Sequence, residues 1–258
     1  MLLKDKIAVI TGAASPRGLG KATAKLFAEH GARVVILDLD DEKAAAAAMD
    51  LPKVTSGEHI GFACNVTSKT DCDSAVARIL KEMKRIDVLV NNAGLSRGLT
   101  KLYEDNIENW EEMIDTNVKG LLYVTRAIVP GMVERNHGHV INLGSIAGHM
   151  AYANGSVYCA TKAAERFISD GLRIDLNGTA LRVTSIDPGM VETDFSKVRF
   201  RGNDERAAKT YQNIDPLKAE DIADAIVWAA TRPTHVSIQS IVLTPTAQAN
   251  PFVLTRKS

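Results

Sequence analysis

The amino-acid sequence predicts an α/β protein built on one doubly wound parallel sheet of about seven strands. Short runs rich in β-branched residues alternate with segments of helical periodicity along the chain. The strand-like runs are almost continuously apolar, as expected where helices cover both faces of a parallel sheet. No stretch rich in Pro, Ser and Gly divides residues 1–258, so we expect a single domain.

The expected elements follow one another in β-α order. The strands are KIAVIT (6–11), RVVILD (33–38), HIGFACNV (59–66), IDVLVNN (86–92), HVINLGS (139–145), LRVTSIDP (181–188) and VSIQSIVLT (236–244). Helical periodicity is clearest in GKATAKLFAEHGA (20–32), CDSAVARILKEMKR (72–85) and GSVYCATKAAERFISDGL (155–172). Ligands of such sheets bind beyond the carboxyl ends of the strands, so the residues at those ends are the first candidates for a site.

Composition excludes several classes of function. Thirty-one basic and thirty-one acidic residues cancel and form no basic stripe, so we expect no nucleic-acid partner. Cys64, Cys72 and Cys159 are odd in number and lack CxxC spacing, which fits a reducing cytosol without disulfides. The apolar stretch GLLYVTRAIVPGMV is interrupted by Arg126 and Pro130, and no signal-peptide pattern begins the chain. We therefore expect a cytoplasmic protein with no membrane partner and, because its histidines show no ligand spacing, no metal.

The first predicted strand runs into TGAASPRGLG, a loop with glycines at 12, 18 and 20 before a helix. Glycines at such a turn let the backbone approach a pyrophosphate, which the helix N-terminus favours. Asp38 ends the second predicted strand, where an acid accepts hydrogen bonds from an adenosine ribose and repels a 2′-phosphate. Arg17 could pair with such a phosphate. However, a flexible surface cation would stabilise a phosphorylated cofactor by less than the carboxylate of Asp38 would destabilise it. The pattern predicts a Rossmann-type site for NAD rather than NADP.

Tyr158 and Lys162 stand four residues apart in YCATK, on one face of a predicted helix. A free phenol ionises only near pH 10, so it needs help to exchange a proton at neutral pH. A cation one turn away favours the ionised phenol. The spacing therefore allows the hydroxyl and the amine to serve one site. Taken alone, Tyr158 has an ordinary explanation as a half-buried packing residue.

These motifs, with NNAG, Asn117, Ser145 and IDPGMVET, together resemble the short-chain dehydrogenases/reductases over essentially the full length. Thirteen residues separate Ser145 from Tyr158, as the active site of that family needs. One departure is visible, because five residues lie between Gly12 and Gly18 where the family usually has three. The contacts of residues 14–17 are therefore the part of the loop that the resemblance does not define.

The resemblance implies a catalytic set of Asn117, Ser145, Tyr158 and Lys162. Tyr158 would act as general acid or base, and Ser145 would donate a hydrogen bond to the reacting oxygen. Lys162 would also bind the nicotinamide ribose, and Asn117 would hold a water behind it. Taken singly, Ser145 is an ordinary strand-end turn residue and Asn117 an ordinary helix cap.

The implied cofactor contacts follow the strand ends. Asn65 would lie beside the adenine, NNAG would line the cleft, and the turn PGMVET would pass under the nicotinamide. The expected cofactor-binding residues are Gly12, Ser15, Arg17, Gly18, Leu19, Gly20, Asp38, Leu39, Asn65, Val66, Asn92, Ala93, Gly94, Tyr158, Lys162, Pro188, Gly189, Val191 and Thr193. Residues 1–109 would be mainly cofactor-binding, and residues 110–258 would carry the catalytic and substrate-binding groups with the C-terminal tail.

The segment after PGMVET carries Arg199 and Arg201, and an Arg fork suits a carboxylate or sulfonate. We expect Ser145, Tyr158, Met190 and Arg199 to bind substrate, although each arginine singly is as well explained by a solvated surface. Residues 109–212 resemble the 3-hydroxy acid and serine 3-dehydrogenases and their sulfoacetaldehyde-reducing relatives, which are typically NADP-dependent. The front part resembles NAD-type relatives of 3-oxoacyl reductases, which raises the hypothesis of two parents joined near residue 109.

The expected function is therefore an oxidoreductase interconverting a small 3-hydroxy acid, or a short hydroxysulfonate, with its carbonyl. The nearest alternatives are a 3-oxoacyl reductase and a polyol or alcohol dehydrogenase, which have no use for Arg199. An NAD-sensing module without turnover has no need of Ser145, Tyr158 and Lys162 together. The resemblance also implies a homotetramer that pairs helices around 112–135 and 157–177, with the last strand forming a second interface.

Overall fold

The computed structural model describes residues 1–54 and 57–257 and contains a seven-stranded parallel sheet. The strands are β1 (Ile7–Thr11), β2 (Arg33–Asp38), β3 (Ile60–Ala63), β4 (Val88–Asn91), β5 (His139–Leu143), β6 (Arg182–Pro188) and β7 (Ser240–Leu243). They lie in the order β3-β2-β1-β4-β5-β6-β7, and all six pairings are parallel. The predicted doubly wound sheet of about seven strands is confirmed.

Six of the seven predicted strands are longer than the observed ones, and two of them by four residues or more. The first, 59–66, begins at Ile60 because the backbone amide of Val34 donates to the imidazole Nδ1 of His59, at 3.0 Å, where a ladder carbonyl would otherwise accept. The second, 236–244, begins only at Ser240, because the amide of Val236 closes a turn onto the carbonyl of Pro233. Local hydrogen bonds thus replace ladder pairing at both strand starts.

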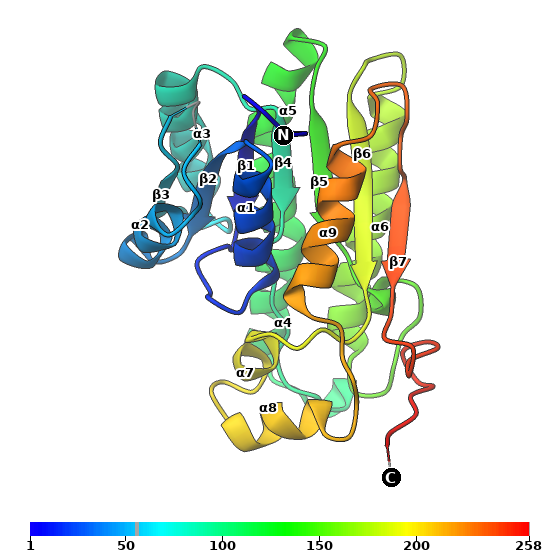
Figure 1. The fold of residues 1–258 in the computed structure, drawn as a ribbon. Helices are drawn as coiled ribbons and strands as arrows, with labels where there is room; N and C mark the ends of the chain where they lie inside the picture. Colours follow the sequence, from blue (N-terminus) through cyan, green and yellow to red (C-terminus); the bar gives the residue numbers. More distant parts are fainter. Residues whose placement is uncertain (55–56, 258) are drawn as a thin grey trace.

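Helices cover both faces of the sheet (Figure 1). Helices α1 (Leu19–Glu29), α2 (Asp41–Met49) and α9 (Ala219–Ala230) pack on one face, and α3 (Lys69–Met83), α5 (Leu121–Glu134) and α6 (Ser156–Asp175) on the other. The remaining helices are α4 (Ile107–Ile114), α7 (Phe195–Arg199) and α8 (Asp204–Tyr211), with short turns η1 (Leu102–Glu104), η2 (Asp115–Gly120) and η3 (Ile146–Gly148). Side chains start two of the outer helices: Asp40 accepts from the amide of Lys43, and Ser68 from that of Asp71.

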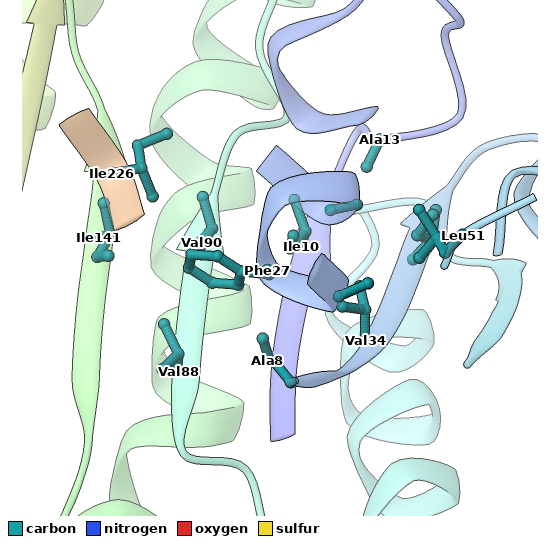
Figure 2. Close-up of a cluster of buried hydrophobic side chains, with 14 of the residues drawn as sticks. Ala8, Ile10, Ala13, Phe27, Val34, Leu51, Val88, Val90, Ile141 and Ile226 are labelled. Carbon is teal, nitrogen blue, oxygen red and sulfur yellow. The ribbon is translucent and has the colours of Figure 1, made fainter. Parts of the chain in front are cut away.

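The core consists of two apolar layers, one on each side of the sheet. Strand β1 is buried along its whole length, because neighbouring strands flank it and helices cover both of its faces. Figure 2 shows the layer under α1, where the fully buried Phe27 lies over the sheet among Ile10, Val34 and Val90. This packing accounts for the continuous apolar runs in the sequence and fixes α1 behind the glycine loop.

The strand order reverses between β1 and β4, since the chain leaves β1 toward β2 and returns to the other side at β4. A crevice forms at such a switch point, beyond the carboxyl ends of the strands. Helices α7 and α8 lie beyond these ends, below the sheet in Figure 1. Residues far apart in the chain therefore meet at one edge of the sheet.

Candidate active site

A cavity of about 770 Å³ lies at this edge and is lined by residues from every part of the chain. The lining includes most of the residues that the sequence singles out: Gly12, Ser15, Gly18, Leu19, Asp38, Leu39, Asn65, Val66, Asn92, Ala93, Gly94, Ser145, Tyr158, Lys162, Pro188, Gly189, Met190, Val191, Thr193 and Arg199. Arg17, Gly20 and Asn117 belong to the predicted set but not to the lining. The structure thus brings the two halves of the predicted site together around one space.

The glycine loop is held in place by the segment NNAG that follows β4. Asn92 donates from Nδ2 to the carbonyls of Thr11 and Gly12, both at 2.8 Å. Gly12 has φ +64°, and a Cβ there would lie 2.8 Å from the Cα of Ala93. Gly20 is buried behind the loop, where a Cβ would lie 2.6 Å from Nδ2 of Asn92. Gly20 therefore serves packing beneath the loop, which explains why it does not reach the cavity.

Asp38 presents its carboxylate where β2 ends. Oδ2 accepts a hydrogen bond from the amide of Ala14, and Oδ1 accepts from the amide of Leu39, each at 2.8 Å. These bonds fix the carboxylate between the glycine loop and the residues that follow β2. Because Asp38 also lines the cavity, its negative charge faces any group bound at this end.

Arg17 does not take the position beside the loop that would let it pair with a phosphate. Its guanidinium forms a surface ion pair with Glu192, with 3.2 Å between Nη2 and Oε1. The neighbouring Ser15 donates from Oγ to Oδ2 of Asp194 at 2.7 Å. Ser15 and Arg17 therefore turn toward the segment after β6. Both lie in residues 14–17, the part of the loop that the family resemblance does not define.

Asn117 lies in a π-helical turn between α4 and α5, which widens the helix locally. Its Oδ1 accepts from the amide of Leu95 and its Nδ2 donates to the carbonyl of the same residue, both at 2.8 Å. Nδ2 also donates to the hydroxyl of Thr161 on α6 at 3.0 Å. Asn117 is thus buried behind the cavity wall, adjoining Gly94, rather than in the lining.

Ser145 follows β5 and begins the turn η3. Its Oγ accepts from the amide of Ala147 at 3.1 Å and lies 3.4 Å from the carbonyl oxygen of Pro188, to which it donates. The second bond is long, so the hydroxyl can be redirected toward a stronger acceptor in the cavity.

Tyr158 and Lys162 both face this cavity from the first turns of α6. Their exposed fractions are only 8% and 7%, so charges on them are poorly screened. The ring of Tyr158 packs against Phe195, with 5.8 Å between ring centroids. Lys162 donates from Nζ to the carbonyl of Leu143 at 2.6 Å. The predicted pair therefore shares one buried site, one turn apart.

The ammonium of Lys162 has a second partner, Glu165, which the sequence reasoning missed. The distance from Nζ to Oε2 is 2.7 Å, and both side chains are buried. Burial acts against the charge of Lys162, yet the neighbouring groups, Glu165 foremost with Tyr158 and Asp187, together hold the pKa of the ammonium above its ordinary value. The i to i+3 spacing on one helix face was the signal that could have revealed this contact.

Arg199, on α7, closes the cavity on the side of Tyr158. Its guanidinium carbon lies 5.3 Å from the ring centroids of both Tyr158 and Phe195. Nη2 donates to the hydroxyl of Tyr152 at 3.3 Å, whereas Nε is buried and has no hydrogen-bond partner within residues 1–54 and 57–257. Burial raises the pKa of Tyr152 to about 12, so its hydroxyl stays neutral. No motif in the sequence pointed to Tyr152.

Arg201 is separated from this arrangement. Its Nη2 donates to Asn109 at 2.9 Å and to Glu112 at 3.1 Å, and Glu112 also pairs with Arg97. These contacts join the end of α7 to α4 at the protein surface. Arg199 and Arg201 therefore do not form a fork, and only Arg199 is directed into the cavity.

Comparison with known protein families matches residues 6–204 to the family described as short chain dehydrogenase. The chain belongs to this family. Its members are oxidoreductases that act on CH–OH groups with a nicotinamide cofactor. In this chain, Asp38, Tyr158 and Lys162 line one cavity beside the glycine loop.

Several relatives are similar over nearly the whole chain. The NADP-dependent 3-hydroxy acid dehydrogenase YdfG of Salmonella typhi is 46% identical over 94% of this short-chain dehydrogenase and 96% of its own length. The serine 3-dehydrogenase of Agrobacterium fabrum is 40% identical over 93% and 94%. A solved closed form of serine dehydrogenase complexed with NADP⁺ superimposes with a TM-score of 0.90 at 42% identity, covering 98% and 100%. Such coverage extends the likeness to both sides of residue 109.

The described part of the chain contains no group of three or more His, Cys, Asp or Glu side chains placed to hold a metal ion. Within the same residues, no helix combines the length and the apolar character that a membrane span requires.

Proposed function

We propose that the protein oxidises a small 3-hydroxy acid, or a short hydroxysulfonate, to its carbonyl compound with NAD⁺, and catalyses the reverse reduction with NADH. The observation that carries the choice of substrate is Arg199, which packs against the ring of Tyr158 and whose buried Nε finds no hydrogen-bond partner among the described residues. Relatives named as 3-hydroxy acid and serine dehydrogenases support the same class of substrate.

In the oxidative direction, Tyr158 takes the proton of the substrate hydroxyl while Ser145 donates a hydrogen bond to the same oxygen. A nicotinamide cofactor bound in the cavity would supply the acceptor for the hydride that leaves the carbinol carbon. Lys162 stabilises the phenolate through its charge and keeps an N–H for a group in the cavity. Asn117 supports this wall by fixing Leu95 and Thr161, the latter in the same turn of α6 as Lys162. The products are the carbonyl compound, NADH and a proton.

The cofactor preference rests on Asp38. A 2′-phosphate at its end of the cavity would face a carboxylate that two backbone amides hold in place. The nearby cations are already paired, Arg17 with Glu192 and Lys43 with Asp40. Several relatives are named for NADP, and we depart from them because a fixed acid opposes the additional phosphate.

The acidic group of the substrate would bind to Arg199. A guanidinium offers parallel N–H donors that match a carboxylate or sulfonate, and the free Nε meets that need. The rings of Tyr158 and Phe195 exclude water around the pair, which strengthens it. A substrate held there places its hydroxyl carbon next to Tyr158.

We also propose that the protein is a homotetramer. Large apolar side chains are exposed on α6 and near the C-terminus, among them Phe167 at 67%, Ile174 at 74% and Phe252 at 54%. Apolar side chains gathered on exposed faces favour association, and a second copy of this chain offers the same faces. The strand β7 and the tail lie at one edge of the molecule in Figure 1, where a second interface could form.

Replacing Tyr158 with Phe should lower kcat for alcohol oxidation by about 100-fold or more, because the proton acceptor is lost. Steady-state kinetics measures this, and fluorescence titration with NADH should show that the variant still binds cofactor. Tyr103→Phe, at an exposed position, is the matched control and should keep full activity. Near-normal turnover by folded Tyr158→Phe would show that another group carries the proton.

The parent protein should use NAD⁺ with a kcat/KM about tenfold or more above that for NADP⁺, a difference of about 1.4 kcal/mol. Asp38→Ser should lower the ratio of kcat/KM for NAD⁺ to kcat/KM for NADP⁺, or reverse the preference, because the charge that repels the 2′-phosphate is removed. Asp73→Asn, which neutralises an exposed acid on α3, should leave the ratio unchanged. A preference of the unsubstituted protein for NADP⁺ would refute the proposed use of NAD⁺.

Arg199→Ala should lower kcat/KM for 3-hydroxypropionate, serine or isethionate by about 10-fold to 150-fold, the worth of hydrogen bonds to a charged group. The neutral substrate butanediol should change by less than about threefold. Arg201→Gln is the control, since that side chain pairs with Asn109 and Glu112 outside the cavity. Equal losses with charged and neutral substrates would contradict a carboxylate clamp.

Sedimentation velocity at micromolar concentration should show a species with four times the mass of the chain. Phe167→Glu should shift the distribution toward smaller species, because a charge would then be buried in the interface. Tyr103→Glu, at an exposed site away from α6, should not. A monomeric parent protein at this concentration would rule out the tetramer.

A further inference from the structure

Glu165 is a buried acid that the reaction described above does not use. It is 2% exposed. On α6 it follows Lys162 by three residues, as Lys162 follows Tyr158 by four. Its Oε2 accepts a hydrogen bond from Nζ at 2.7 Å. An acidic side chain therefore touches the group that activates the proton carrier.

The second oxygen of this carboxylate is costly for the fold. Oε1 of Glu165 is buried and finds no hydrogen-bond partner in the described part of the chain. A buried polar atom left without a partner costs on the order of 1–3 kcal/mol, and more when it is charged. An apolar residue would avoid this cost, so packing gives no reason for an acid at this position.

We infer that Glu165 is a positioning residue that fixes the ammonium of Lys162 and sets the pH range in which Tyr158 exchanges its proton. The inference rests on the proposed function, because it concerns the same Tyr158–Lys162 pair. It adds a third member to the group that governs proton transfer.

The hydrogen bonds explain the fixing of the ammonium. A lysine ammonium has three N–H donors, and here the carbonyl of Leu143 and the carboxylate of Glu165 accept two of them. One N–H then remains for a group in the cavity. Because both acceptors are buried and held by secondary structure, Nζ cannot swing away from the wall of the site.

The charges explain the pH range. Burial raises the pKa of Glu165 to about 7, although the charge of Lys162 opposes the rise. When Glu165 is neutral, it does not oppose the effect of the positive charge of Lys162 on Tyr158. At a pH above this pKa, a negative charge appears beside the ammonium and opposes a second negative charge on the phenol. An ionised Glu165 therefore works against the help that Lys162 gives to the phenolate, whereas a neutral residue at 165 would not.

One other acid contributes to this environment. Asp187 on β6 raises the pKa values of both Lys162 and Glu165 through its charge. Its carboxylate is held by His149 at 2.8 Å, Ser185 at 2.6 Å and Ser240 at 3.1 Å. These partners stay in place when Glu165 is replaced, so the effect of Glu165 can be measured against a constant background.

The test is the pH profile of kcat/KM for alcohol oxidation in Glu165→Gln, with Glu165→Leu as a second charge-removing variant. In both, the acidic limb should move to lower pH by about 1 unit, the effect of losing one nearby charge. The alkaline limb should also move to lower pH, because the charge of Glu165 no longer offsets the effect of burial on the pKa of Lys162. Glu165→Asp keeps a carboxylate and should stay closer to the parent.

Asp170→Asn removes an acid from the surface of the same helix, where it pairs with Arg173, and should not shift the profile. A direct readout needs no substrate: near-ultraviolet difference titration of each protein against its Tyr158→Phe counterpart reports ionisation of this phenol. It should shift to lower pH in the Gln and Leu variants. If either folded variant loses activity at every pH without a shift in midpoint, Glu165 is merely structural and the inference fails. If no alcohol is turned over, the proposed function fails, and the spectroscopic titration still decides the role of Glu165.

Discussion

The site depends on one constraint, that the carboxyl ends of β1 and β4 meet at a single point of the sheet. At that point the amide of Asn92 binds the carbonyls of Thr11 and Gly12, and this joins the glycine loop to the strand on the other side of the switch. Asp38 adds a second tie through the amide of Ala14. The glycine loop, Asp38 and this wall of the cavity are thereby held together by contacts that involve no side chain of α6.

Most of the fold could be predicted because apolar runs and helical periodicity report burial directly. The bounds of the predicted strands were less accurate than their existence, as at the two starts where His59 and the turn at Pro233 satisfy backbone groups locally. Such local bonds leave no trace in a pattern of hydrophobicity, since they depend on where one side chain or one carbonyl points. Strand existence follows from burial, whereas strand length follows from hydrogen bonding.

The candidate site was predictable where function requires a fixed spacing, as for Tyr158 and Lys162. It was not where a side chain had two chemically sensible partners. Arg17 could have paired with a phosphate but pairs with Glu192. Arg201 could have bound an anion together with Arg199 but pairs with Glu112. Glu165 and Tyr152 were missed for a related reason, because their importance comes from contacts to Lys162 and Arg199 that no motif records. The charge of a side chain therefore does not predict its partner, because the partner depends on distance and burial in the folded structure.

The close approach of Gly12 to Ala93 limits how such a chain can be recombined. A crossover between these positions would take the glycine turn from one parent and its NNAG support from another, at a contact that leaves no room for a Cβ. A junction after Gly94 inherits both from the same source. Residue 109 lies beyond that contact, so homologous enzymes that exchanged the segments after this position would leave the glycine turn and its NNAG support together.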